Sequence, residues 1–172
     1  MRRAILITIL AATTAAVAAG AAPGGDNAVV ASASGGYGMS GTAAGSNFTI
    51  HPFTFTAHIR ADGSVDGRFT YTQVRDEVQL TASGTLDCAV IQGNQAWVGG
   101  VIEDSSRASL IGLDMWFQVQ DNGEPGSDET PDMSSSLGAG GPGTGDQYCA
   151  AHPVVLFPFF VETGNLQVRP AG

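Results

Sequence analysis

An acidic stretch in the second half of the chain is the segment whose residues could do chemistry most directly. The sequence DNGEPGSDETPD, residues 121–132, holds five acidic side chains, two prolines and two glycines. Carboxylate and amide oxygens at this density are the ligands that calcium prefers. The sequence therefore raises the hypothesis of a calcium site, with these candidate ligands: Asp121, Asn122, Glu124, Asp128 and Asp132.

The spacing of these residues does not match the calcium loop of an EF-hand. Gly123 and Pro125 occupy the third and fifth loop positions without a side-chain oxygen, and Asp132 stands where a bidentate glutamate is expected. The same stretch suits a reversal of the chain, because Asn122 or Gly123 tolerates a positive φ and Pro125 stiffens the exit. A turn is the favoured interpretation, and a calcium site of another geometry is the alternative.

Catalytic signatures are weak throughout the sequence. It contains no G-x-S-x-G elbow and no H-E-x-x-H pair, the signatures of two common classes of secreted hydrolase. The carboxylates of Asp87, Glu103 and Asp114 would form a hydrolytic pair only if two of them met in one pocket. The dinucleotide-type match GYGMSG, residues 36–41, is not followed by a helical pattern. We therefore predict a protein that is not an enzyme and has no cofactor beyond the calcium considered above.

The first 21 residues have the layout of a secretory signal peptide. Arg2 and Arg3 precede an uncharged apolar run that ends in small residues, with a favoured cleavage point after Ala21. The apolar run is shorter than the ~20 residues that a membrane-spanning helix needs. We therefore predict a secreted, extracellular protein with no transmembrane segment after cleavage.

The charge of the chain argues against two classes of partner. Without Arg2 and Arg3, five arginines stand against sixteen acidic residues, a formal charge of 5 − 16 = −11. Nucleic acids and anionic membrane surfaces are bound by basic faces, so both are poor partners for this chain. The partner stays unknown at this point, and a cell-wall or extracellular glycan is the candidate carried forward.

Two cysteines, Cys88 and Cys149, are present in a chain predicted to enter an oxidising compartment. An even count there favours one disulfide over free thiols. The bond would close a loop of about 60 residues and stabilise the fold by up to ~4 kcal/mol on the chain-entropy model. A catalytic cysteine paired with His152 is the disfavoured alternative, because export argues against a reactive thiol.

Alternating apolar residues indicate the fold class. Segments with apolar residues at every second position are 53–59, 65–71, 78–90, 96–102 and 111–119, and a closing hairpin is expected from 154–161 and 166–168. No window outside the first 21 residues keeps helical spacing for three turns. We therefore predict an all-β fold, a single antiparallel β-barrel or β-sandwich of about seven to nine strands.

The predicted domain organisation follows from composition. Residues 22–46 are rich in Gly, Ala and Ser and are interpreted as a leader, within which 28–38 could supply a first strand. Residues 47–172 are assigned to one β-domain, which is long enough to bury its own core. Residues 134–147 are interpreted as a mobile, glycine-rich loop inside that domain. The prediction is thus a signal peptide at 1–21, a leader and one β-domain.

Several short motifs follow one another along the β-domain. VDGRFTY, LDCAVIQGNQAWVGG, FQVQDNGEPGSDETPD, a later YC and a closing GNLQV together resemble a group of small secreted bacterial β-domains. That group shares, in this order, a strand ending in a GN turn, a DNG turn followed by PD, and a terminal GN hairpin. The likeness covers residues 47–168. It implies an all-β fold and a turn at 121–132, and it implies no activity and no binding residue.

The functional hypotheses follow from these patterns. The leading hypothesis is a secreted, non-enzymatic β-domain that acts as a binding or structural module at or beyond the cell surface. A calcium-stabilised domain that uses the turn at 121–132 is the alternative. A hydrolase with scattered carboxylates is the least favoured of the three.

Overall fold

The structure, a computed structural model, describes residues 27–43, 45–124, 130–154 and 159–172. The predicted signal peptide and the candidate calcium ligand Asp128 lie outside these ranges. Within the described part of the chain, no helix has the length and apolar character needed to cross a bilayer.

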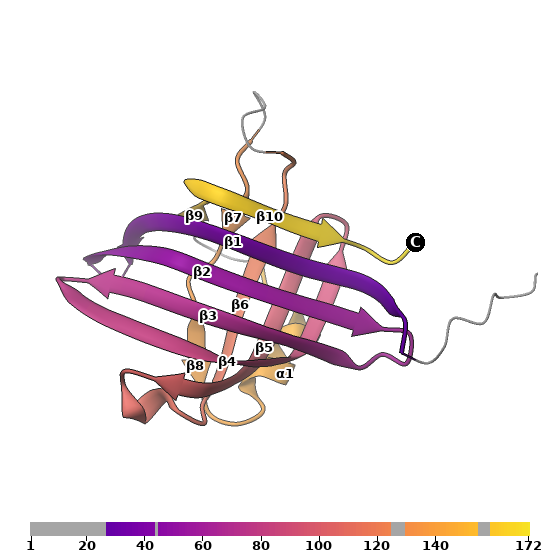
Figure 1. Cartoon of the computed structure of the whole chain (residues 1–172), viewed down its shortest axis with the longest axis horizontal. Helices are drawn as coiled ribbons and strands as arrows, with labels where there is room; N and C mark the ends of the chain where they lie inside the picture. Colours follow the sequence, from indigo (N-terminus) through magenta and orange to yellow (C-terminus); the bar gives the residue numbers. More distant parts are fainter. Residues whose placement is uncertain (1–26, 44, 125–129, 155–158) are drawn as a thin grey trace, which may run out of the picture.

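A single antiparallel sheet dominates the described chain (Figure 1). Its strands are β1 (Val29–Ala43), β2 (Ser46–Arg60), β3 (Val65–Arg75), β4 (Val78–Gln92), β5 (Gln95–Ser105), β6 (Asp114–Gln120), β7 (Met133–Ser134), β8 (Gly138–Gly140), β9 (Phe159–Phe160) and β10 (Thr163–Arg169), with helices η1 (Ala108–Leu110) and α1 (Thr144–Ala151). The strand order is β10-β1-β2-β3-β4-β5-β6-β7-β9, and β8 pairs with β6. The sheet curls into a half-barrel, with β5 to β8 and α1 behind β1 to β4. The predicted all-β fold is therefore confirmed.

The period-two pattern of the sequence is the physical basis of these strands. In β2, Phe53, Phe55 and Ala57 are buried while Thr54 and Thr56 between them are exposed. Successive side chains of a strand point to opposite faces, so one face of β2 enters the core and the other meets solvent. The same logic applies to β3 and to the core-facing side of β5 and β6.

The core fills the inside of the curl and is rich in aromatic rings. The Phe53 ring packs edge-on against Phe117, with 4.9 Å between centroids, and against Tyr37 and Tyr71 at 5.2 and 5.9 Å. Edge-to-face geometry suits the charge distribution of aromatic rings, and each ring buries a large apolar area. Burial raises the pKa of the Tyr37 hydroxyl well above its usual range, so it stays protonated.

Strand β1 lies inside the segment that composition assigned to a leader with a possible first strand. It spans fifteen residues and pairs with β2 on one side and β10 on the other. The GYGMSG match at 36–41 is therefore strand backbone and does not open a helix. The β-domain begins before residue 47, because β1 is an integral part of the sheet.

Residues 159–169 contain β9 and β10, the two strands at opposite ends of the strand order. The β9 segment pairs with β7, and Val161 N continues that pairing to Asp132 O at 2.8 Å. Two residues later β10 pairs with β1, and Glu162 N bonds Gly38 O at 2.9 Å. The predicted closing hairpin is therefore wrong in its pairing. The sheet offers two separate edges here, and each part of the last segment takes one of them.

A second layer covers the outer face of β4 to β6. Helix α1 packs there, and Cys149 on it forms a disulfide with Cys88 on β4, with an S–S distance of 2.07 Å. The predicted disulfide is thus confirmed. Gly99 on β5 allows the close approach, because a Cβ at this position would lie 2.6 Å from Cys88 Sγ. Residues 134–147, predicted to be a mobile loop, contain β8 and the first turn of α1.

Candidate functional site

Asp132, one of the predicted calcium ligands, is a buried carboxylate between two parts of the sheet. Its side chain is 7% exposed. Oδ1 accepts a hydrogen bond from Asn122 N at 2.8 Å, and Oδ2 accepts one from Leu166 N at 3.0 Å. Leu166 belongs to β10, so the carboxylate supplies to this strand an acceptor that a neighbouring strand would otherwise supply.

Asp121 repeats this arrangement two residues further along β10. Its Oδ1 accepts from Gly123 N at 3.0 Å and its Oδ2 from Val168 N at 2.8 Å. Gly123 has φ 115°, a conformation that favours glycine, and the chain bends at this residue. In the described part of the acidic stretch, 121–124 and 130–132, the two outermost carboxylates thus hold the last strand against the end of β6.

Asn122 is also fully engaged. Its Oδ1 accepts from Gln120 Nε2 at 2.7 Å and from Asn94 Nδ2 at 3.2 Å, and its Nδ2 donates to Pro131 O at 2.8 Å. Glu124 is exposed at the surface of the turn. Among the described residues, the acidic side chains of this turn do not gather their oxygens within 4.8 Å of one another.

We expect millimolar calcium to leave the melting temperature of the purified protein unchanged. A cation at this turn would compete with N–H donors for the oxygens of Asp121 and Asp132, and Asn122 Oδ1 already accepts two hydrogen bonds. Differential scanning calorimetry with calcium and with EDTA measures this directly. A rise of several degrees that magnesium does not reproduce would establish the calcium site instead.

A pocket of about 260 Å³ lies on the outer face of β5 and β6, next to β7. Its polar lining includes three glutamines, Gln95, Gln118 and Gln120, which alternate along the strands with the core residues Ala96, Phe117 and Val119. Its apolar lining includes Met133 and Val154. Val119 and Ser134, both about 1% exposed, also line it, so the pocket reaches from the outer face to the margin of the core.

The glutamines form a directional chain of side-chain amides. Gln118 Nε2 donates to Gln95 Oε1 at 3.2 Å, and Gln95 Nε2 donates to Gln120 Oε1 at 2.8 Å. Gln120 Nε2 then donates to Asn122, whose own amide group donates to the carbonyl of Pro131. A carbonyl only accepts, so this last bond fixes the orientation of every amide before it.

Because the orientation of these amides is fixed, Gln118, the first amide of the hydrogen-bonded series, is left with an oxygen that is unpaired within the described part of the chain. Its side chain is 92% buried, since only 8% is exposed, and its Oε1 has no hydrogen-bond partner among the described residues. Leaving a buried acceptor unsatisfied costs about 1–3 kcal/mol. Because the amide chain determines which end of the group is the oxygen, the unpaired polar atom of Gln118 is an acceptor.

The two serines in the pocket lining also use their protons internally. Ser134 Oγ donates to Ser135 O at 3.0 Å and receives the Tyr37 hydroxyl at 2.6 Å. Ser135 Oγ donates to Ser136 O at 2.9 Å and accepts from Gln118 N at 2.9 Å. Both hydroxyls, which belong to buried residues, are thus engaged by groups of the protein.

The aromatic residues near this face are packed within the protein. Trp97 is 4% exposed, donates from Nε1 to Pro153 O at 2.9 Å and contacts the His152 ring at 5.4 Å. Trp116 stacks on Tyr148 with 5.9 Å between centroids. Trp97 therefore supports the segment that follows α1, while Trp116 and Tyr148, both half-buried, pack β6 against α1.

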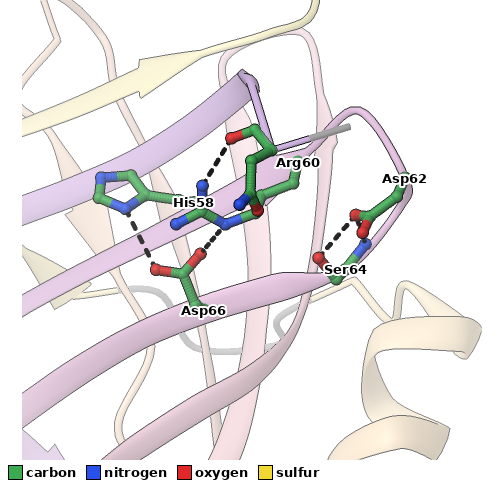
Figure 2. A network of polar contacts seen from close by, with 6 residues as sticks. His58, Arg60, Asp62, Ser64 and Asp66 are labelled. Atoms are coloured by element: carbon green, nitrogen blue, oxygen red, sulfur yellow. Dashed lines mark hydrogen bonds and ion pairs between the residues drawn. The ribbon is translucent and has the colours of Figure 1, made fainter. Parts of the chain in front are cut away.

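A second, more open depression of about 660 Å³ lies over β2, β3 and β4. Asp66 in its lining accepts from Arg60 Nε at 2.6 Å and lies 3.6 Å from His58 Nδ1, as Figure 2 shows. The Arg60 guanidinium holds the pKa of Asp66 below its usual range. Ser64 likewise lowers the pKa of Asp62 in the adjacent turn. These are exposed contacts that brace the β2–β3 hairpin.

Of the scattered carboxylates considered for hydrolysis, Asp87 and Asp114 come near each other. The pKa of Asp87 is raised, first by partial burial and then by the charges of Asp146 and Asp114. Asp114 Oδ2 accepts from Gly145 N at 3.1 Å, which stabilises the start of α1. Ligand atoms of Asp87, Asp146 and Cys88 lie within 4.8 Å, but the Cys88 sulfur is committed to the disulfide.

No known family model, curated protein or solved structure matches this chain. The resemblance to small secreted β-domains therefore stays a prediction, and the site is interpreted from its own geometry. Gln118 and Gln95 carry no sequence signal, because polar residues at alternate positions are ordinary on the outer side of a strand.

Proposed function

We propose that the protein is an exported, non-enzymatic binding module whose ligand site is the pocket on β5, β6 and β7. The observation that carries the proposal is that Gln118 lines the pocket and that its buried Oε1, an acceptor, has no partner among the described residues. Unsatisfied buried polar atoms are rare in folded proteins, and a ligand donor is one way to satisfy this one.

Export is supported by independent features. The first 21 residues follow the signal-peptide pattern, and the disulfide between Cys88 and Cys149 suits an oxidising compartment. A binding role is supported by the lining chemistry. The described lining consists of amides, hydroxyls and apolar groups, which orient a ligand and do not exchange protons near neutral pH.

The test is a screen of the mature protein against glycan and cell-wall arrays, repeated with Gln118→Met. We expect at least one retained class of ligand, and we expect Gln118→Met to abolish its retention while the melting curve still shows a folded protein. Retention that is unaffected by Gln118→Met would overturn the assignment of this pocket. Release of reducing ends from an arrayed polymer would favour a hydrolase that uses Asp87.

A further inference from the structure

We infer that the pocket binds a neutral saccharide unit, one of whose hydroxyl groups donates a hydrogen bond to Gln118 Oε1. The inference rests on the proposed function and goes further by naming the class of ligand. Three properties of the described lining support it, namely the direction of its hydrogen bonds, its charge, and its size and apolar surface.

The unpaired hydrogen-bonding atom found among the described lining residues is an acceptor. Gln118 Oε1 is oriented by the amide chain that ends on Pro131 O, and the hydroxyls of Ser134 and Ser135 are already engaged by groups of the protein. A ligand that pairs with this acceptor must supply a hydrogen-bond donor. Sugar hydroxyls are donors that can also accept, so they can pair with Oε1 and still bond to the second N–H of a glutamine amide.

Charge selects among ligands that carry donors. The whole chain has a formal charge of −9, so an acidic sugar would meet a repulsive field. The described lining holds neither a cation to pair with a carboxylate nor a carboxylate to pair with an ammonium group. Desolvating a charge without a partner is costly, and this favours an uncharged ligand.

The apolar lining suits the C–H face of a sugar ring. Met133 lines one part of the pocket, and Val154 lines another with 83% of its surface exposed. A volume of about 260 Å³ is at the small end for ligand pockets, which suits one ring or the end of a chain. A single unit would therefore contact Gln118 with a hydroxyl and Met133 or Val154 with its carbon skeleton.

The experiment is a nuclear magnetic resonance titration of the ¹⁵N-labelled mature protein, observed at the side-chain amide of Gln118. The probes are methyl β-glucoside, glucuronate and ethylammonium, which share small size and donor groups but differ in charge. We expect methyl β-glucoside to shift this resonance saturably and the two ions to leave it in place. Gln118→Met should weaken binding by about tenfold or more, as expected for the loss of one buried hydrogen bond.

Two further variants serve as controls. Gln79→Met makes the same change at an exposed glutamine of β4 and should bind methyl β-glucoside as the wild type does. If Gln118→Met does not fold, Val154→Ser changes a lining residue that is 83% exposed and should weaken methyl β-glucoside binding without loss of the fold.

The outcomes separate this inference from the proposed function. Binding of ethylammonium or glucuronate at Gln118 without binding of the glucoside overturns the saccharide assignment and leaves the pocket as a binding site. If none of the three probes shifts the Gln118 resonance, the saccharide assignment is also overturned. If array retention is in addition insensitive to Gln118→Met, the proposed function of the pocket fails as well.

Discussion

Asp132→Ala is expected to lower the free energy of unfolding by about 3 kcal/mol, because it removes a buried charged acceptor from two backbone N–H groups. The N–H groups belong to Asn122 in the turn and Leu166 in β10, and Leu166 is itself 1% exposed. Water does not easily replace the lost acceptor at such a site. Urea denaturation followed by circular dichroism gives the free energy directly.

Asp104→Ala is the matched control for this prediction. Asp104 is an exposed aspartate near the end of β5, and surface substitutions of this kind usually change stability by less than about 0.5 kcal/mol. Asp132→Asn should recover part of the loss, because one amide oxygen still accepts while the NH₂ group faces the other donor. Equal stability of Asp132→Ala and Asp104→Ala would show that the carboxylate does not stabilise the attachment of β10.

The central strands were predictable because each carries its own burial pattern. The alternation of Phe53, Phe55 and Ala57 selects one face, and a one-residue shift would move all three into solvent. The turn at 62–63 and the turn at 93–94 are equally local, since Gly63 and Gly93 take the positive φ that their positions require. Local chemistry thus determines most of the sheet.

Strand pairing at the two ends of the sheet depends on contacts between residues far apart in the sequence, which no local pattern encodes. The pairing of β10 with β1 joins residues more than a hundred positions apart, and nothing in Leu166 to Val168 distinguishes that partner from β9. Helix α1 was missed for a different reason. It has two turns and buries only Gly145 and Cys149, which is too short for a periodic signal.

The role of the acidic stretch shows the same limit. The positive φ at Gly123 was predictable from the sequence, but the use of Asp121 and Asp132 depends on where β10 lies. The pocket could not be predicted from the sequence. Its acceptor is defined by a chain of amides that crosses from β5 to β6 and ends at Pro131, and this chain exists only after the strands have paired.

Replacing both cysteines, Cys88→Ser with Cys149→Ser, is expected to lower the free energy of unfolding by about 4 kcal/mol. The bond spans 61 positions, and a loop of this size removes much of the conformational freedom of the unfolded chain on the entropy model. Urea denaturation of the double variant, and of the wild type with a reductant, measures the loss. The double substitution avoids a lone thiol that could form mixed disulfides.

The same variant also tests how the two layers depend on each other. The disulfide holds α1 on the outer face of β4, and the segment after α1 brings Pro153 O to Trp97 and Val154 to the pocket. Reduction should therefore weaken methyl β-glucoside binding at urea concentrations where the far-ultraviolet spectrum of the sheet is still intact. A loss of stability below about 1 kcal/mol would mean that packing alone holds α1 in place, because the loop-closure effect would then be largely absent.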